Sequence, residues 1–306
     1  MSDETPHLRI IRHVDRTAVV PTNAEMEAAL VSIDAAGAML PSERWVGRCY
    51  VCGRTAELTE EHIPPRSAFN KERTRKISLD DLLGRDELEL PDSGEVTQGG
   101  IRGFTLCDSC NNLTGVRWGR EYHEWAKSLV MLIQAIYSKH GDLDGMTGFP
   151  AATDVTFRTC YPARLLRQAL SMFLSLSGGP DLAEQYPDLR ALVLGEAPRS
   201  LPSPLSLYFQ AYAGPIGRFV GGRGAIRHDL ATGELQRLMQ IDFVPMSFML
   251  LLDGPPLDTG TDISEFATYE VDTKSTLTFE TIHIGFGHTP FPTDYRTKAQ
   301  ILAGRR

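Results

Sequence analysis

Two Cys-x-x-Cys pairs constrain this chain more than any other feature of its sequence. The first pair is Cys49 and Cys52, and the second is Cys107 and Cys110. Four thiolates in two such pairs are a common ligand set for a structural zinc ion, which they surround tetrahedrally. The sequence therefore predicts that two distant segments meet around one Zn²⁺ ion. The alternatives are a redox site or a coincidence of spacing.

Three polar residues near these pairs have complementary chemistry. Glu61 directly precedes His62, and Asn111 directly follows the last cysteine. Histidine titrates near neutral pH and can act as a base, whereas carboxylate and amide oxygens bind hard divalent cations such as Mg²⁺. Phosphodiester hydrolysis needs an activated water and neutralisation of the charge that builds on the phosphoryl oxygens. Because neighbours on a strand face opposite sides, the backbone must bend if Glu61 and His62 serve one site.

Composition and charge limit the classes of function. Hydrophobic residues make up 42% and charged residues 23% of the 306 positions, as in soluble globular proteins. No apolar run approaches the roughly 20 residues that a membrane helix needs, and residues 1–14 lack the apolar centre of a signal peptide. Four of the five cysteines lie in the two pairs, which suits a reducing compartment. A cytoplasmic protein without membrane contact is expected.

Any contact with nucleic acid must be local, because the net charge is −8. One basic cluster lies just downstream of His62, and its alternative interpretation is a solvated loop. Its members are Arg66, Lys71, Arg73, Arg75 and Lys76.

The sequence divides into three expected segments of an α+β protein. Residues 1–44 form an N-terminal extension, in which apolar residues at helical spacing predict one helix over Asn23–Leu40. Residues 45–140 contain strands near Leu58–Ile63 and Phe104–Leu106, a charged insertion over residues 71–100, and a helix from Asn112 to about Gly141. The Gly- and Pro-rich stretch 141–153 is the expected boundary.

The third segment, residues 154–306, predicts two helices packed on a mostly antiparallel sheet. A helix should begin at Tyr161-Pro162 and stop at Gly178, and a second should occupy Leu182–Leu194. Alternation and apolar runs then predict strands, whereas Gly221-Gly222-Arg223-Gly224 predicts a turn. The expected strands are Leu205–Tyr212, Leu238–Val244, Ser247–Leu252 and Thr276–Phe286. No family resemblance covers this segment.

The order of a Cys-x-x-Cys pair, an acidic-His-Ile-x-Pro segment and a Cys-x-x-Cys-Asn segment resembles the zinc-stapled branch of the HNH nucleases, which have the ββα-metal fold. The resemblance covers roughly Trp45–Lys127. It implies that His62 is the general base and that Glu61 and Asn111 bind a catalytic Mg²⁺ or Mn²⁺ ion. It also implies that the four cysteines hold structural zinc.

The sequence departs from the family pattern at one position. The middle Asn that usually lies a few residues before the third cysteine is absent, and Arg102 and Gly103 stand there instead. That residue normally fixes the loop and orients the base. Asn70, in the insertion, is the candidate substitute.

The resemblance implies a metal-dependent endonuclease that hydrolyses phosphodiester bonds, with DNA favoured over RNA. Defence against foreign DNA follows by analogy alone. A homodimer is favoured, because single-site nucleases often pair to cut both strands, and an activating protein or ligand at the C-terminal domain is a further candidate partner. The alternative is a non-catalytic zinc-stabilised module whose C-terminal domain recognises a protein or small ligand. In that case Asn111 is an N-cap of the following helix.

Overall fold

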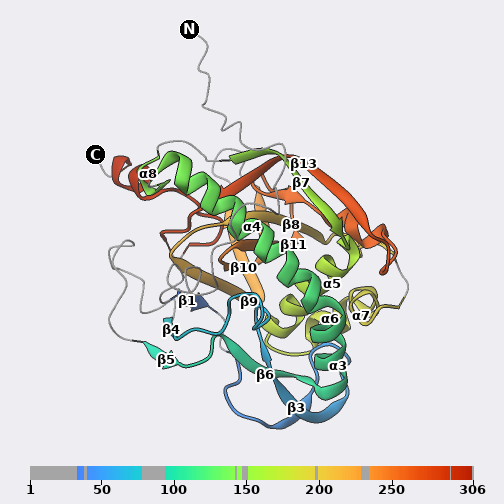
Figure 1. Ribbon diagram of the computed structural model, residues 1–306. Helices are drawn as coiled ribbons and strands as arrows, with labels where there is room; N and C mark the ends of the chain where they lie inside the picture. The colour runs from blue at the N-terminus through green and yellow to red at the C-terminus, as the bar shows by residue number, and fades with distance from the viewer. Residues whose placement is uncertain are drawn as a thin grey trace.

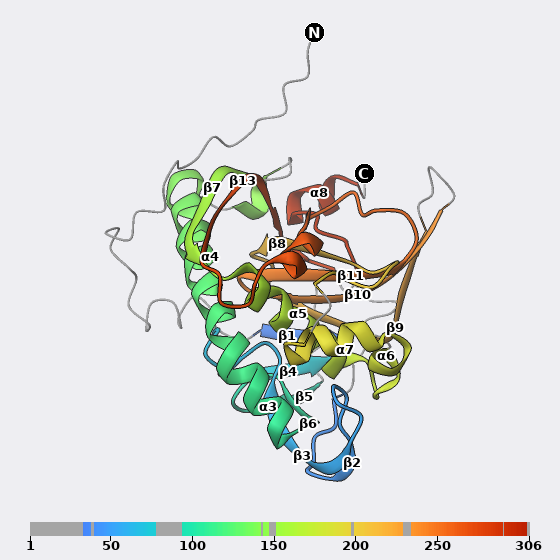
Figure 2. The ribbon, with the colours of Figure 1, turned by 90° about the vertical axis from the view of Figure 1, so that its right-hand side faces the viewer.

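The structure is a computed structural model that describes residues 33–37, 40–77, 94–141, 143–146, 151–196, 199–228, 234–289 and 291–304. It has mixed α and β composition, as the sequence predicted. Figures 1 and 2 show a large sheet in the upper part of the molecule, the long helix α4 running along it, and a small sheet beside α3 at the lower end. Among the described residues, no helix is long and apolar enough to cross a membrane.

The large sheet contains ten strands and is mostly antiparallel. Its order is β5-β4-β1-β9-β10-β11-β8-β13-β7, and the short β12 pairs with β8. The parallel pairs are β1 with β4, β1 with β9, and β13 with β8. The bounds are β1 Ile33–Gly37, β4 Thr74–Ile77, β5 Glu95–Thr97, β7 Ala151–Cys160, β8 Ser206–Tyr212, β9 Ile216–His228, β10 Leu235–Phe243, β11 Met246–Asp253, β12 Thr261–Asp262 and β13 Ser275–Gly285.

Three strands of this sheet come from the first two predicted segments. The helix predicted over Asn23–Leu40 is wrong for residues 33–37, which form β1, and most of its remaining positions lie outside the described residues. β1 bonds in parallel to β4 on one side and β9 on the other, so long-range pairing outweighs the local helical spacing. The predicted insertion likewise contributes β4 and β5.

The C-terminal strands were mostly predicted, with two exceptions. The Gly-rich stretch 221–224 is part of β9 and not a turn. There the pairing of β9 with β10 shifts register, and Gly222 and Gly224 take φ values of 64° and 80°. The glycines thus permit a bulge inside a continuous strand. The second exception is β7, which begins in the stretch that was expected to be a loop.

Helices pack on one face of the large sheet. They are α4 Gly119–His140, α5 Pro162–Leu176, α6 Asp181–Gln185 and α7 Pro187–Leu194, and a separate helix, α8 Lys298–Ala303, lies near the C-terminus. The predicted aromatic stripe is core, since Trp118, which directly precedes α4, and Tyr122 and Trp125 of α4 are all buried. Trp125 stacks on Phe157 of β7, with ring centroids 4.1 Å apart. One hydrophobic cluster joins Tyr122, Trp125 and Phe157 to the cysteines, so the second and third predicted segments share a core.

The other face of the sheet carries a buried ion pair. Arg218 of β9 and Asp242 of β10 are direct cross-strand partners, with 2.5 Å between Nε and Oδ2. Arg218 Nη1 also donates to the carbonyl oxygens of Phe291 and Asp294, at 2.5 Å and 2.8 Å. These bonds fasten the C-terminal segment across the sheet.

Candidate metal centre and the histidine beside it

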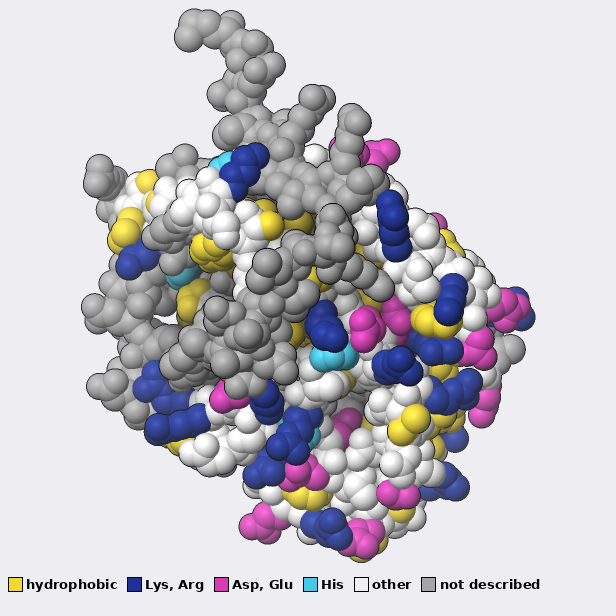
Figure 3. All heavy atoms as spheres, viewed as in Figure 1, with side chains coloured by type: hydrophobic (Ala, Val, Ile, Leu, Met, Phe, Trp, Pro, Cys, Tyr) yellow, Lys and Arg dark blue, Asp and Glu magenta, His cyan; other side chains and the backbone are white. Residues whose placement is uncertain are grey.

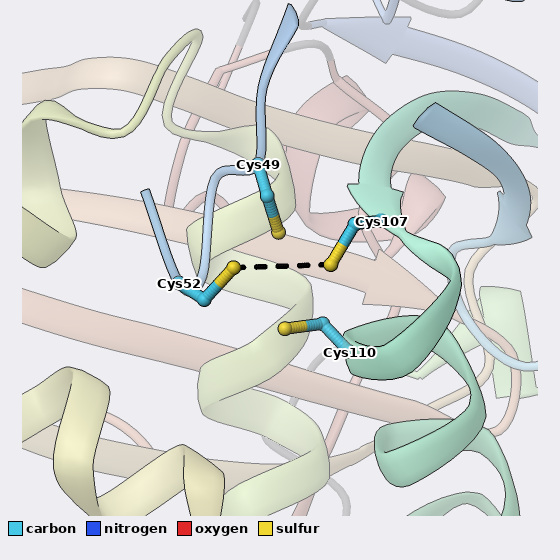
Figure 4. A group of neighbouring side chains, drawn as sticks. All are labelled: Cys49, Cys52, Cys107 and Cys110. Carbon is cyan, nitrogen blue, oxygen red and sulfur yellow. Dashed lines mark hydrogen bonds between the residues drawn. The ribbon is translucent and has the colours of Figure 1, made fainter. Parts of the chain in front are cut away.

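The four paired cysteines meet at the lower end of the molecule, as predicted. Cys49 and Cys52 lie on the turn after β2 (Val46–Arg48), Cys107 ends β6 (Arg102–Cys107), and Cys110 lies in α3 (Asp108–Leu113). Their sulfur atoms all lie within 4.8 Å of one another, and all four residues are buried. Figure 4 shows the four sulfur atoms directed at one point. The Sγ atoms of Cys52 and Cys107 are 3.8 Å apart. Four buried sulfurs in this arrangement fit a tetrahedral metal ion such as zinc.

The local backbone explains why Cys49 and Cys52 lie on one tight turn with their side chains close together. Gly53 takes a φ of 71°, which glycine adopts without strain, and its N–H donates to the carbonyl of Cys49 at 2.8 Å. The thiol of Cys110 lowers the pKa of Cys49 through a hydrogen bond. Arg54 lies beside the sulfurs, with Nε 3.5 Å from Cys52 Sγ. Arg54 therefore offsets part of the negative charge that four thiolates would bring.

The strand that carries the expected catalytic residues pairs irregularly with its neighbour. β3 (Thr55–His62) is antiparallel to β6, and α3 follows β6 directly, whereas the segment predicted as a loop between the two strands contains β4 and β5. Thr59 pairs with Leu106, but the next residue, Glu60, pairs with Phe104. Thr105 is therefore an extra residue, and its carbonyl accepts a hydrogen bond from Tyr50 N at 3.0 Å. A bulge of this kind bends the strand that contains the extra residue, here β6, and increases the local twist of the pair.

Beyond the bulge, Glu61 turns into the protein. It is 8% exposed, and its Oε1 accepts hydrogen bonds from the hydroxyl groups of Thr105 and Ser175, the latter at 2.6 Å. Ser175 belongs to α5, so Glu61 joins the small sheet to the helical layer. Burial raises the pKa of Glu61 to about 8, which favours the neutral carboxyl.

His62 turns to the opposite side and is half-buried. Its Nε2 lies 2.9 Å from the carbonyl oxygen of Gly99. A carbonyl only accepts hydrogen bonds, so Nε2 carries the proton and Nδ1 is the acceptor of the neutral ring. Desolvation lowers the pKa of His62, and the nearby charges of Arg66 and Arg102 lower it further, whereas the Gly99 carbonyl and Glu60 act in the other direction. The neutral ring, which can accept a proton, is favoured at pH 7.

Asn111 lies against the backbone of β3. Its Nδ2 donates to Thr59 Oγ1 at 3.0 Å and to the carbonyl of Glu60 at 2.8 Å. The helix begins at Asp108 with Cys107 in the N-cap position, so the N-cap interpretation of Asn111 is wrong. Asn111 instead fastens α3 to β3 at the bulge.

Of the three residues predicted to act together, the structure places His62 and Asn111 beside the outward-facing Glu60 and turns Glu61 away. Sequence analysis missed Glu60, Gly99 and Ser175. The Glu60-Glu61 repeat was a signal that either carboxylate could serve the site, and the burial of β3 shows that Glu61 is turned inward while Glu60 is exposed.

The basic residues predicted to contact nucleic acid lie near this site. Arg66, Lys71 and Arg73 are exposed, and Arg75 and Lys76 belong to β4 and not to a loop. Figure 3 shows Lys and Arg side chains on the lower half of the face, over the region that Figure 1 labels β3 to β6, with Asp and Glu side chains among them. Because Arg66 and Arg102 lie close enough to act on His62, a phosphate group there would meet positive charge, although the whole chain is acidic.

Asn70, the candidate substitute for the missing Asn, holds the loop next to His62. It is 1% exposed, its Nδ2 donates to the carbonyls of Pro64 and Ile101 at 2.6 Å and 2.9 Å, and its Oδ1 accepts from Ile101 N at 2.7 Å. Gly100 has a φ of 89°, and a Cβ there would lie 2.4 Å from the Asn70 carbonyl oxygen. Asn70 therefore ties the residues after His62 to the turn whose Gly99 carbonyl holds the imidazole.

We expect Asn70→Ala to lower the free energy of unfolding by about 1–3 kcal/mol, because it leaves buried donor and acceptor groups of the backbone unpaired. Urea denaturation followed by circular dichroism measures this change. The matched control is Asn112→Ala, which removes an exposed amide from α3. An equal, small effect of both substitutions would contradict the anchoring role of Asn70.

Comparisons with known proteins return no match, since no family, no curated protein and no solved structure is significantly similar to this chain. The structure itself therefore gives the class: a protein of mixed α and β structure with four buried cysteines that can bind a metal ion such as zinc. A role for His62 and its neighbours has to be inferred from their geometry and chemistry.

Proposed function

We propose that this protein is a metal-dependent endonuclease of the HNH type that hydrolyses phosphodiester bonds in nucleic acid, with DNA favoured over RNA. The observation that carries the proposal is the setting of His62. Its imidazole is held through Nε2 by the Gly99 carbonyl, while Arg66 and Arg102 act on it as neighbouring positive charges. A neutral histidine near two arginines is suited to taking a proton from water beside a bound phosphate.

Each group has one role in this proposal. Nδ1 of His62 accepts the proton of the attacking water, and the arginines attract and orient the phosphodiester. The donors near His62 are oxygen atoms, which fit Mg²⁺ or Mn²⁺ and not a soft metal. Asn111 is the amide ligand, because both hydrogen bonds of its amide use Nδ2 and leave Oδ1 as the donor atom for a cation. When bound, such a cation neutralises charge on the phosphoryl and leaving oxygens.

The four cysteines have a structural role in this proposal. Zinc at this point fixes the turn after β2, the end of β6 and the start of α3 relative to one another. Because β3 pairs with β6, the same ion holds His62 and Asn111 in register. Binding of nucleic acid is expected to be sensitive to salt, since a local basic surface on a chain of net charge −8 makes the contact. A homodimer and a role in defence against foreign DNA remain hypotheses by analogy.

The test is cleavage of supercoiled plasmid by the zinc-loaded protein with Mg²⁺, Mn²⁺ or EDTA. We expect cutting with either cation, none with EDTA, and a steep decline as NaCl is raised from 50 to about 200 mM. Zinc content measured in the same samples controls for loss of the structural ion. If neither DNA nor RNA is cut at full zinc content, the non-catalytic binding module becomes the better hypothesis.

A further inference from the structure

Two neighbouring glutamates in β3 have opposite environments. The side chain of Glu60 is 35% exposed, whereas Glu61 is 8% exposed. The hydroxyl groups of Thr105 and Ser175 both donate to Oε1 of Glu61. A cation could use this oxygen only if α5 moved away or the hydrogen bonds broke. Glu61 therefore does not fit the role of a ligand that meets substrate.

The division coincides with the bulge in β6. Burial along β3 passes from Leu58 to Glu61, a step of three, and Glu60 stays at the surface. The extra residue Thr105 lies opposite this break in the alternation, between the partners of Thr59 and Glu60. Thr105 then bonds Glu61 through its hydroxyl and the cysteine turn through its carbonyl.

Glu60 shares the outer side of β3 with His62. Residues two apart on a strand are about 7 Å apart, which leaves room for a cation and a water between carboxylate and imidazole. Glu60 is among the charges that act on His62. Asn111 lies against the backbone of the same residue, since its Nδ2 donates to the main-chain carbonyl of Glu60 at 2.8 Å. Glu60 is thus next to His62 along β3 and in backbone contact with the expected amide ligand.

The partner of Glu60 can be displaced. Arg102 Nη1 lies 2.9 Å from Oε2, and both side chains are partly exposed. Exposed ion pairs contribute little to stability, so a divalent cation can replace the guanidinium group without unfolding the strand. Arg102 would then be free to meet the phosphate.

We propose that Glu60, and not Glu61, is the carboxylate that binds the catalytic cation together with Asn111, and that Glu61 is a structural anchor between β3 and α5. The inference rests on the proposed nuclease function. It also predicts a Mn²⁺ site that binding alone can detect.

The test compares Glu60→Gln with Glu61→Gln, and Glu57→Gln is the matched control because it removes an exposed, ion-paired glutamate from the same strand. Mn²⁺ binding is titrated by the electron paramagnetic resonance signal of the free ion, and plasmid cleavage is measured in parallel at equal zinc content. We expect Glu60→Gln to weaken Mn²⁺ binding by about 10-fold or more and cleavage by about 100-fold. Glu57→Gln should match the wild type, and Glu61→Gln should retain Mn²⁺ binding.

The outcomes separate this inference from the proposed function. If Glu61→Gln loses Mn²⁺ binding and cleavage while Glu60→Gln behaves like Glu57→Gln, the inference is overturned and the nuclease proposal stands. If the wild type cuts nothing but binds Mn²⁺ through Glu60, the cation site is upheld and the nuclease proposal fails. Absence of Mn²⁺ binding by the wild type, or equal binding by Glu60→Gln, overturns the inference.

Discussion

Replacing His62 by Ala is expected to lower nucleic-acid cleavage by about 10²–10⁴-fold, the contribution of a positioned general base. The physical reason is the loss of the only proposed proton acceptor at the site. His62 is half-buried and held by the Gly99 carbonyl, so no solvent group takes its place with the same orientation. The initial rate of plasmid nicking, at saturating Mg²⁺ and equal zinc content, measures the effect.

Two comparisons distinguish the loss of a base from a loss of folding. His140→Ala removes a histidine in the last turn of α4, far along the chain from β3, and should leave the nicking rate unchanged. Added imidazole should restore part of the activity of His62→Ala, since a small base can occupy the space of the missing ring. Cutting at the wild-type rate by His62→Ala would contradict the role of His62.

Loss of the structural metal is expected to have the largest effect on stability. Structural zinc contributes apparent binding free energies of about 10–16 kcal/mol in small zinc domains, and removal leaves four cysteines buried around an unfilled centre. The elements that carry the cysteines are short, since β2 has three residues and α3 has six, so their own packing contributes little stability without the metal. We expect Cys107→Ala to bind less than one equivalent of zinc and to lower the unfolding midpoint by about 10 °C or more, at roughly 2–4 °C per kcal/mol.

Cys160→Ala is the matched control for this prediction. Cys160 is also a buried cysteine, but it ends β7 and its thiol donates to the Ser275 carbonyl at 3.3 Å. The Cys160→Ala variant should bind a full equivalent of zinc and lose only the stability that a buried thiol contributes. Metal analysis and thermal unfolding of both variants provide the comparison. Full zinc content in Cys107→Ala would show that the four sulfurs do not form the site.

The site was predictable from sequence where local spacing sets the chemistry. Two Cys-x-x-Cys pairs have few uses besides metal binding, so their spacing alone predicts that Cys49 meets Cys110. Strand β3 was predictable from its composition and the prolines that end it. Helix α5 was predictable for a similar reason, because Pro162 begins it and Gly178 follows its end.

The predictions failed where distant segments pair. β1 has helical spacing in sequence but forms hydrogen bonds with β4 and β9 on its two sides. The strands β4 and β5 are short and charged, so their own sequences do not indicate strands. They form because β4 pairs with β1 of the large sheet and β5 pairs with β4. The division into residues 1–44, 45–140 and 154–306 remains a prediction, although one sheet and one core join parts of all three.

The sequence by itself determined that four cysteines would gather and that an acidic residue, a histidine and an asparagine would lie nearby. Only the tertiary structure decided which of the two neighbouring acids is buried. Glu61 is the buried one, and its carboxyl oxygen accepts hydrogen bonds from Thr105, the extra residue in the partner strand, and from a serine of α5. Periodicity within a segment is local and can be read in order along the chain, whereas register and side-chain direction depend on the strand or helix that packs against it.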